Sequence, residues 1–435
     1  MSVEDPVARA AVIRYEDAVL RYSAQWQSAL EALEIEPENV LVRVLAADYY
    51  LAKGNLAETQ QQLQHALRVE EAGLCPPTAR ERALSLAMRQ WLLEGEPHAA
   101  LATLLHALKQ YPADLFMLKR TQLVAFVLGD AEAMLHAARL SEAECQQTPL
   151  FYGLLSFALE QNGQGSLAEV AARRALELDA RDVWAQHCLA HTLYFSGRHE
   201  EGTAFLQAHA SSWDDCMSFM YTHNYFHLAI AHLALGHWDA VEHIFDQYVW
   251  PFEEPVPVDD GRAFARTDRS DVQDQLGALG LLLKYELRRE KYGEENPLVL
   301  RWANVLEYVV LPVRSLDPLH DVLVVHALTR LGRLDEAEAA VNTTMREYVE
   351  AQQDAARRDA LTVQWLGYAR GVLAAGRGDW SAAADLISQA LATGGGAAMG
   401  GSNEQREVLH EFLLLSFEKS GQLERAEAYR QQHWT

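Results

Sequence analysis

Four glycines recur at one fixed interval, and this interval constrains the fold more than any other feature of the chain. Gly95, Gly129, Gly163 and Gly197 each follow the previous one by 34 residues. Each glycine stands where one amphipathic helical pattern ends and the next begins. A helix–turn–helix unit that repeats every 34 residues is typical of tetratricopeptide repeats. The interval predicts an all-α fold, a tetratricopeptide-repeat-like superhelix (α-solenoid) of stacked antiparallel helix hairpins.

Turn glycines continue, with looser spacing, along the rest of the chain. Further turn glycines are predicted at Gly54, Gly236, Gly332, Gly378 and Gly421. Apolar residues at helical spacing predict helices over Val40–Ala52, Asp321–Leu331 and Gln405–Lys419. A single hairpin would leave an apolar face in water, and stacking the hairpins buries these faces in one continuous core.

The repeat over residues 148–182 matches the expected pattern best. With Gly163 at position 15 of the repeat, Ser156 falls at position 8 and small residues fall at positions 20, 24 and 27, where the two helices of a hairpin come close together. These small residues are Ala168, Ala172 and Ala175. We therefore expect all three alanines to be buried inside this hairpin.

Two segments interrupt the helical pattern. Residues 251–270 contain prolines and an acidic cluster, which predict an irregular loop. We expect this loop to separate N-terminal helical repeats (1–250) from C-terminal helical repeats (271–435), both packed as one continuous array. Residues 393–402 contain five glycines and predict a non-helical connection, after which Ser402 and Gln405 form a capping box at the start of the next helix.

Charge and composition exclude several classes of partner. The chain of 435 residues carries 37 basic and 61 acidic residues, a net charge of −24. Without a basic patch, neither nucleic acid nor an anionic membrane is an expected partner. The N-terminus lacks the pattern of a secretory signal, and no long apolar run predicts a membrane span. The four cysteines form no CxxC pair and are expected as free thiols, so the predicted location is cytoplasmic.

Two histidine pairs form the strongest candidate site. His187 and His191 are four residues apart, as are His223 and His227, so each pair shares one face of a helix. In tetratricopeptide folds the corresponding positions of the first helix of a hairpin line the concave groove. Four converging imidazoles can bind a divalent metal or perform acid–base chemistry on a small molecule. They can equally be structural histidines, and the Glu of an HExxH zincin is absent.

A second candidate follows the glycine-rich segment. Ser402, Asn403, Gln405 and Arg406 stand at a predicted helix start, where backbone N–H groups and a nearby arginine can hold an anion. The alternative is a connector followed by a capped helix. The Lys of a phosphate-binding loop is missing, which argues against nucleotide binding. If the array closes on itself, Asp274 and Arg406 would face the same cavity as the histidines.

Several longer stretches carry a family resemblance. They are Thr78–Met134, Asp182–His191, His223–Ala231 with its HNYFH element, continuing through Trp238–Tyr248, and Gly400–Leu409 with its GGSNEQR element. On these stretches the chain resembles the tetratricopeptide repeat protein 38 family, in its bacterial form, over nearly its whole length. The resemblance implies a helical repeat architecture and no defined activity. The chain departs from the pattern at Leu323, where another His is expected, and at Glu407, where an Asp is expected.

Two classes of function are open on this sequence. The first is a scaffold that binds a protein, peptide or other ligand in its concave groove. The alternative is a small-molecule-binding protein or enzyme with a His-lined internal pocket, which can work with or without a divalent metal as its cofactor. Whether the chain is catalytic is not decided by these residues. The candidate groove residues are His187, His191, His223, Asn224, His227, Asp274, Asn403 and Arg406, of which the four histidines are the candidate metal ligands.

Overall fold

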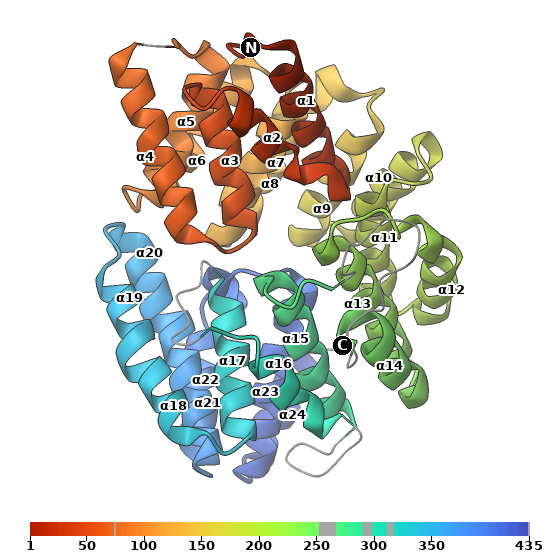
Figure 1. Ribbon diagram of the computed structural model, residues 1–435. Helices are drawn as coiled ribbons and strands as arrows, with labels where there is room; N and C mark the ends of the chain where they lie inside the picture. Colours follow the sequence, from red (N-terminus) through yellow and green to blue (C-terminus); the bar gives the residue numbers. More distant parts are fainter. Residues whose placement is uncertain (74, 252–266, 290–297, 311–316, 434–435) are drawn as a thin grey trace. The chain divides into compact units, whose positions relative to one another are not determined.

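The computed structural model describes residues 1–73, 75–251, 267–289, 298–310 and 317–433. These residues form helices and short turns, and the sole extended pairing among them is an isolated antiparallel bridge between Ser23 and Cys216 (Figure 1). The described residues divide into two compact units. Unit 1 comprises residues 1–126 and 130–231, and unit 2 comprises residues 127–129, 232–251 and 267–433.

Unit 1 contains the first part of the helical series. The α-helices in it are α1 (Pro6–Arg21), α2 (Ser28–Ile35), α3 (Val40–Ala52), α4 (Leu56–Ala72), α5 (Ala79–Leu92), α6 (Pro97–Gln110), most of α7 (Leu115–Leu128), α8 (Ala131–Cys145), α9 (Pro149–Gln161), α10 (Gly165–Leu178), α11 (Val183–Phe195), α12 (His199–His209) and most of α13 (Ser218–Ala234). Successive helices pair as antiparallel hairpins, as α3 with α4, α5 with α6 and α9 with α10 (Figure 1).

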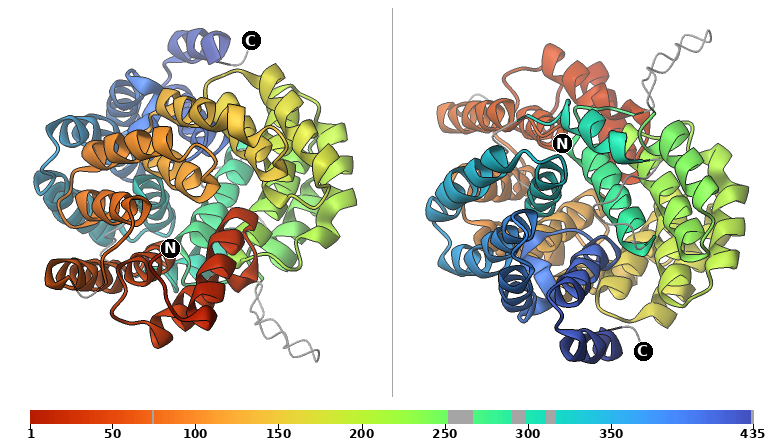
Figure 2. Two further views of the ribbon diagram at one scale, coloured as in Figure 1. Left: turned by 90° about the horizontal axis from the view of Figure 1, so that it is seen from above. Right: turned by 90° about the horizontal axis from the view of Figure 1, so that it is seen from below.

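Unit 2 continues the series with more irregular helices. It contains α14 (Trp238–Ile244), α15 (Val272–Arg288), α16 (Val299–Leu306), α17 (Pro318–Arg330), α18 (Leu334–Ala339), α19 (Arg346–Glu350), α20 (Ala355–Ala360), α21 (Gly367–Gly376), α22 (Trp380–Leu391), α23 (Asn403–Lys419) and α24 (Leu423–His433). π-Helical turns over 340–345 and 361–366 lead directly into α19 and α21. Two further views show the same helical hairpins from above and below (Figure 2).

The glycine interval is confirmed as a series of equivalent turns. Gly95, Gly129, Gly163 and Gly197 follow α5, α7, α9 and α11, and their φ angles lie between +69° and +72°. A left-handed φ is strained for residues with a Cβ, which explains why glycine recurs here. The further turn glycines predicted along the chain also have positive φ angles. The predicted fold class, an all-α stack of tetratricopeptide-type hairpins, is therefore confirmed.

The hairpin of α9 and α10 packs as its sequence predicts. Ala168, Ala172 and Ala175 of α10 have no exposed surface. Ser156 of α9 is also fully buried, and its hydroxyl donates a hydrogen bond to the carbonyl of Ala168 over 2.8 Å. Because alanines occupy the contact, the two backbones approach closely enough for a serine side chain to bridge them.

The two interrupting segments have different outcomes. The predicted loop at 251–270 falls largely on residues outside the described part of the chain, so the boundaries proposed around it stay predictions. In the 393–402 segment the structure has a short 3₁₀ turn, Gly394–Met399, in which Gly395 and Gly396 have positive φ angles. The segment is thus a tight glycine turn rather than an entirely non-helical connection. The capping box of Ser402 and Gln405 at the start of α23 is confirmed.

A buried ion network joins α15 to α23 inside unit 2. The ammonium of Lys284 lies 2.6 Å from a carboxylate oxygen of Glu404 and 2.8 Å from one of Glu407. Arg288 lies 2.8 Å from the same oxygen of Glu407. Lys284 and Glu404 are almost fully buried. Because both charges have left water, each depends on the other.

Two smaller predictions concern cysteines and membrane spans. The four cysteines are free, as predicted; Cys145 and Cys188 are buried, while Cys75 and Cys216 are partly exposed. Among the described helices, none combines the length and the apolar character needed to cross a bilayer.

Candidate metal centre

Helices α11 and α13 of unit 1 carry the four candidate histidines. Asp182 caps the start of α11, where its carboxylate accepts hydrogen bonds from the backbone N–H groups of Trp184 and Ala185. The four-residue spacing then places His187 and His191 on one face of α11. His223 and His227 occupy one face of α13 in the same way. Each sequence pair therefore becomes one side of a site between two first helices of successive hairpins.

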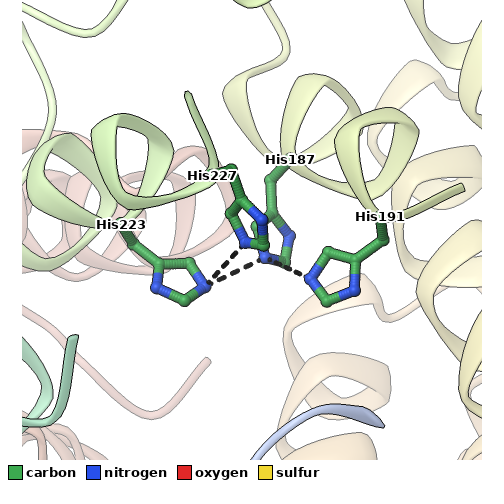
Figure 3. Close-up of side chains that lie close together, drawn as sticks. All are labelled: His187, His191, His223 and His227. Carbon is green, nitrogen blue, oxygen red and sulfur yellow. Dashed lines mark hydrogen bonds between the residues drawn. The ribbon is translucent and has the colours of Figure 1, made fainter. Parts of the chain in front are cut away.

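The four rings point their Nε2 atoms toward one another, as Figure 3 shows. The Nε2 atom of His187 lies 3.0 Å from that of His191 and 3.1 Å from that of His223. The Nε2 atom of His223 lies 3.2 Å from that of His227. Contact between His187 and His223 joins the two helices, so the pairs predicted separately from the sequence form a single cluster.

The cluster is a compact group rather than a row. Five pairs of its rings have centroids between 4.5 and 4.9 Å apart, including His187 with His227 and His191 with His227. One ligand atom from each histidine can be chosen so that all four lie within 4.8 Å of one another. A single ion can reach four donors only in such a group.

Aromatic residues of unit 1 pack around the imidazoles. None of the four histidines is more than 5% exposed. Trp184 stacks on His187 with a centroid separation of 4.5 Å, and Phe219 stacks on His223 at 5.0 Å. Phe157 contacts His191 edge-on, and Phe226 contacts both His223 and His227. These rings fix the imidazole planes and keep them in apolar surroundings.

Burial lowers the pKa values of His187 and His223, so these two imidazoles are uncharged at neutral pH. The pKa of His223 is lowered to about 3 because burial disfavours the imidazolium form. The pKa of His187 is lowered well below its usual value by burial first, and then by the nearby His191 and His223. Neutral rings at neutral pH retain a lone pair on one nitrogen, which is the form that binds metals.

Hydrogen bonds among the four rings cannot satisfy all of these contacts at once. A neutral imidazole nitrogen carries either one proton or one lone pair. The Nε2 atoms of His187 and His223 each make two contacts with other Nε2 atoms. Each of these two nitrogens must therefore share a single proton or a single lone pair between two neighbours. One cation that accepts four lone pairs would resolve this conflict.

The nitrogen spacing fits a transition metal with small adjustments. Zinc–imidazole bonds of about 2.0–2.1 Å put tetrahedral ligand nitrogens about 3.3–3.4 Å apart. The three Nε2 separations of 3.0–3.2 Å need to change by a few tenths of an ångström, while the widest separation must close from at most 4.8 Å. An all-imidazole donor set suits zinc, copper, nickel or iron rather than calcium or magnesium.

The four other predicted groove residues are divided between the two units. Asn224 is on α13 beside His223 and is fully buried. Asp274, Asn403 and Arg406 belong to unit 2. That these residues contact a ligand in the groove stays a prediction.

In unit 2, each of the three has a structural contact. Asp274 accepts a hydrogen bond from the backbone N–H of Asp268 over 2.9 Å. Arg406 donates to the side chain of Asn403 over 2.7 Å and to the carbonyls of Gly400 and Gly401. These bonds tie the start of α23 to the glycine turn, as the capped-helix interpretation of this segment expects.

Sequence reasoning missed one acidic neighbour of the cluster. Glu160, near the end of α9, is 5% exposed, and its Oε2 atom lies 3.6 Å from Nδ1 of His191. Its place in the 34-residue repeat could have indicated it. Glu160 lies three residues before Gly163, on α9, which is the first helix of the hairpin before α11. An acidic residue at an inward position of a neighbouring first helix is the feature to look for.

Comparison with known proteins finds distant structural likenesses. No family model matches the sequence. Yeast Tom70 is 10% identical over 96% of this chain and 89% of that chain, with a TM-score of 0.44. A human IFIT1 dimer with PPP-AAAA is 13% identical over 90% of this chain and 95% of that chain, with a TM-score of 0.39. The TPR domain of P58(IPK) is 12% identical over 95% and 98% of the two chains, with a TM-score of 0.21.

Proposed function

We propose that this repeat protein binds one transition metal ion between α11 and α13, through Nε2 of His187, His191, His223 and His227. The observation that carries the proposal is the convergence of four buried imidazoles, with three Nε2–Nε2 separations of 3.0–3.2 Å. Such close contacts between like groups are costly unless something bridges them, because two of the nitrogens have more neighbours than they can bond.

Coordination by four protein nitrogens supports a structural role for the ion. Zinc sites that perform catalysis keep one position for water or substrate, whereas structural sites fill all four positions with protein ligands. All four candidate ligands are buried and walled by aromatic rings. Because the ligands come from two successive hairpins, the ion would cross-link α11 to α13 and add its binding free energy to the stability of unit 1.

Metal analysis of the purified protein tests the proposal. The protein is prepared without a histidine tag, stripped with a chelator and titrated with Zn²⁺ and with Co²⁺. We expect one ion per chain and, with Co²⁺, visible absorption bands that report four-coordinate nitrogen ligation. His187→Ala and His223→Ala remove one ligand from each helix and abolish tight binding. His136→Ala, an exposed histidine on α8 of the same unit, is the matched control and leaves binding unchanged.

Two results would contradict metal binding at this cluster. One is a wild-type chain that retains and takes up no ion. The other is unchanged affinity in folded His187→Ala and His223→Ala variants, which would mean that the ion binds at another site. Circular dichroism of each variant establishes that it is folded before its affinity is compared.

A scaffold role is the second proposal, and it is supported by the repeat fold together with the net charge of −24. Hairpin stacks of this class present extended surfaces to partner proteins, and an acidic chain attracts basic segments. Fluorescence anisotropy with matched basic and acidic peptides tests this role, and we expect the basic peptide to bind more tightly. Binding of neither peptide argues against the role. Membership of the tetratricopeptide repeat protein 38 family, suggested by HNYFH and GGSNEQR, belongs to this proposal.

A further inference from the structure

Glu160 occupies a position that is unfavourable for a carboxylate. It is the last residue but one of α9, where the carboxyl end of the helix dipole repels negative charge. It is also buried, so that it has lost most of its contact with water. The neighbouring Gln161 donates a side-chain hydrogen bond to Oε2 of Glu160. A cation bound in the adjacent histidine cluster would lower both costs.

His191 connects this carboxylate to the histidine cluster. One ring nitrogen, Nδ1, lies 3.6 Å from Oε2 of Glu160, and the other, Nε2, lies 3.0 Å from Nε2 of His187. A proton on Nδ1 faces the carboxylate and leaves the Nε2 lone pair directed into the cluster. The gap to Glu160 exceeds a normal hydrogen bond by about 0.5 Å, a movement that a small ring rotation supplies.

His187 has a different neighbour on its outer nitrogen. Its Nδ1 atom lies 4.0 Å from the sulfur of Cys188, and that thiol donates to the carbonyl of Gly153. A thiol engaged in this way is a weak, uncharged partner. By contrast, the outer nitrogen of His191 lies beside a carboxylate, that of Glu160.

We propose that Glu160 is a positioning residue of the metal centre, which holds Nδ1–H of His191 and offsets the charge of the ion. This inference rests on the proposed function. Four neutral imidazoles leave a divalent ion with its full double charge among aromatic rings, and the carboxylate lowers the net charge of the centre to about +1. Hydrogen bonding to a carboxylate also makes the opposite nitrogen of a ligand histidine a better donor.

Replacing the carboxylate by an isosteric amide tests the inference. With Zn²⁺ alone as the probe, in competition with a chromophoric chelator, Glu160→Gln is expected to weaken binding about 10- to 100-fold. Glu160→Asp keeps the charge on a shorter side chain and is expected to lose less affinity. Glu177→Gln, on the exposed face of α10, is the matched control and is expected to leave the affinity within about twofold of wild type.

A double-mutant cycle separates positioning from a general structural effect. If Glu160 positions His191, Glu160→Gln lowers the affinity less in the His191→Ala background than in the wild-type chain, because only the charge offset remains to be lost. An equal loss in both backgrounds overturns the inference, as does unchanged Zn²⁺ affinity in folded Glu160→Gln. If Glu160→Gln does not fold, Glu160→Asp and the cycle built on it decide the question. Absence of Zn²⁺ binding by the wild-type chain would instead overturn the proposed function itself.

Discussion

A polar cluster of unit 1 and a polar network of unit 2 are built in different ways. In unit 1, four buried imidazoles turn toward one another, and the Nε2 atoms of His187 and His223 each have two like neighbours. In unit 2, the buried ammonium of Lys284 lies within 2.8 Å of two carboxylates. The members of the lysine network are complementary as they stand, whereas those of the histidine cluster are alike.

The difference separates structural from functional burial. Opposite charges that satisfy each other need no further partner, and a network such as Lys284–Glu404 holds two helices in register. Like groups that converge in an apolar place store a cost that an added cation removes. Whether a buried polar cluster is structural or functional is therefore judged better from the complementarity of its members than from their burial alone. The predictions below test this comparison, from the largest expected effect to the smallest.

Removing the cation of the unit 2 network has the largest expected effect. Lys284→Met leaves Glu404 and Glu407 without their ammonium partner, and we expect the free energy of unfolding to fall by about 3–5 kcal/mol. Lys419→Met, an exposed lysine on α23, is the control for the loss of one charge. Urea denaturation with and without Zn²⁺ measures both. A loss that Zn²⁺ reverses would break the distinction between the units.

Metal removal has the next largest effect and acts on unit 1. At a free Zn²⁺ concentration of about 100 times its Kd, the ion adds about 2.7 kcal/mol to the free energy of unfolding. Chelation removes this increment from the wild-type chain and has no effect on His187→Ala. Fluorescence of Trp184, which stacks on His187, reports the change beside the site. Equal responses in wild type and variant would place the stabilising ion elsewhere.

Acid pH tests a buried histidine of unit 2 that has no part in the cluster. His326 packs edge-on against Phe412, and burial lowers its pKa from 6.5 to about 3. Below pH 6.5 the unfolded chain binds a proton that the folded chain refuses, so stability falls as the pH decreases towards 3. Between pH 7 and pH 5 this one group costs about 2 kcal/mol.

Substitution of His326 isolates the contribution of its imidazole to the pH dependence of the free energy of unfolding. In His326→Leu the loss between pH 7 and pH 5 is expected to be smaller than in wild type by about 2 kcal/mol. Replacement of the exposed His136 by leucine is the control for the loss of one histidine. Denaturant titrations at several pH values provide the measurement. An unaltered slope in His326→Leu would show that its imidazole is protonated in the folded chain.

The smallest effect concerns a hairpin contact of unit 1. Ser156→Ala removes the hydrogen bond to the carbonyl of Ala168 and is expected to cost about 1 kcal/mol. Because the bond between Ser156 and Ala168 joins α9 to α10 and involves none of the four histidines, Zn²⁺ affinity is expected to stay at the wild-type value. A simultaneous loss of affinity would mean that hairpin packing and the metal centre are coupled, which would sharpen the role of α9 in the site.

The sequence predicted which histidines share a face of one helix, but not which helices come together. The spacing of His187 with His191, and of His223 with His227, placed each pair on one helical face, because the α-helical period relates residues four apart. The burial of the alanines of α10 was predictable for the same reason, and the capping box at Ser402 was predictable because it joins residues three apart at a helix start. The 3₁₀ turn after Gly394 was not, because a run of glycines allows many backbone conformations.

By itself, the sequence determined where helices begin, turn and end, since caps, glycine turns and apolar periodicity act between residues close together in the chain. Only the tertiary structure decided that His187 meets His223, that Glu160 lies beside His191 and that Lys284 lies between Glu404 and Glu407. These contacts join residues on different helices. They depend on the rotation and separation of packed helices, which a local pattern does not specify.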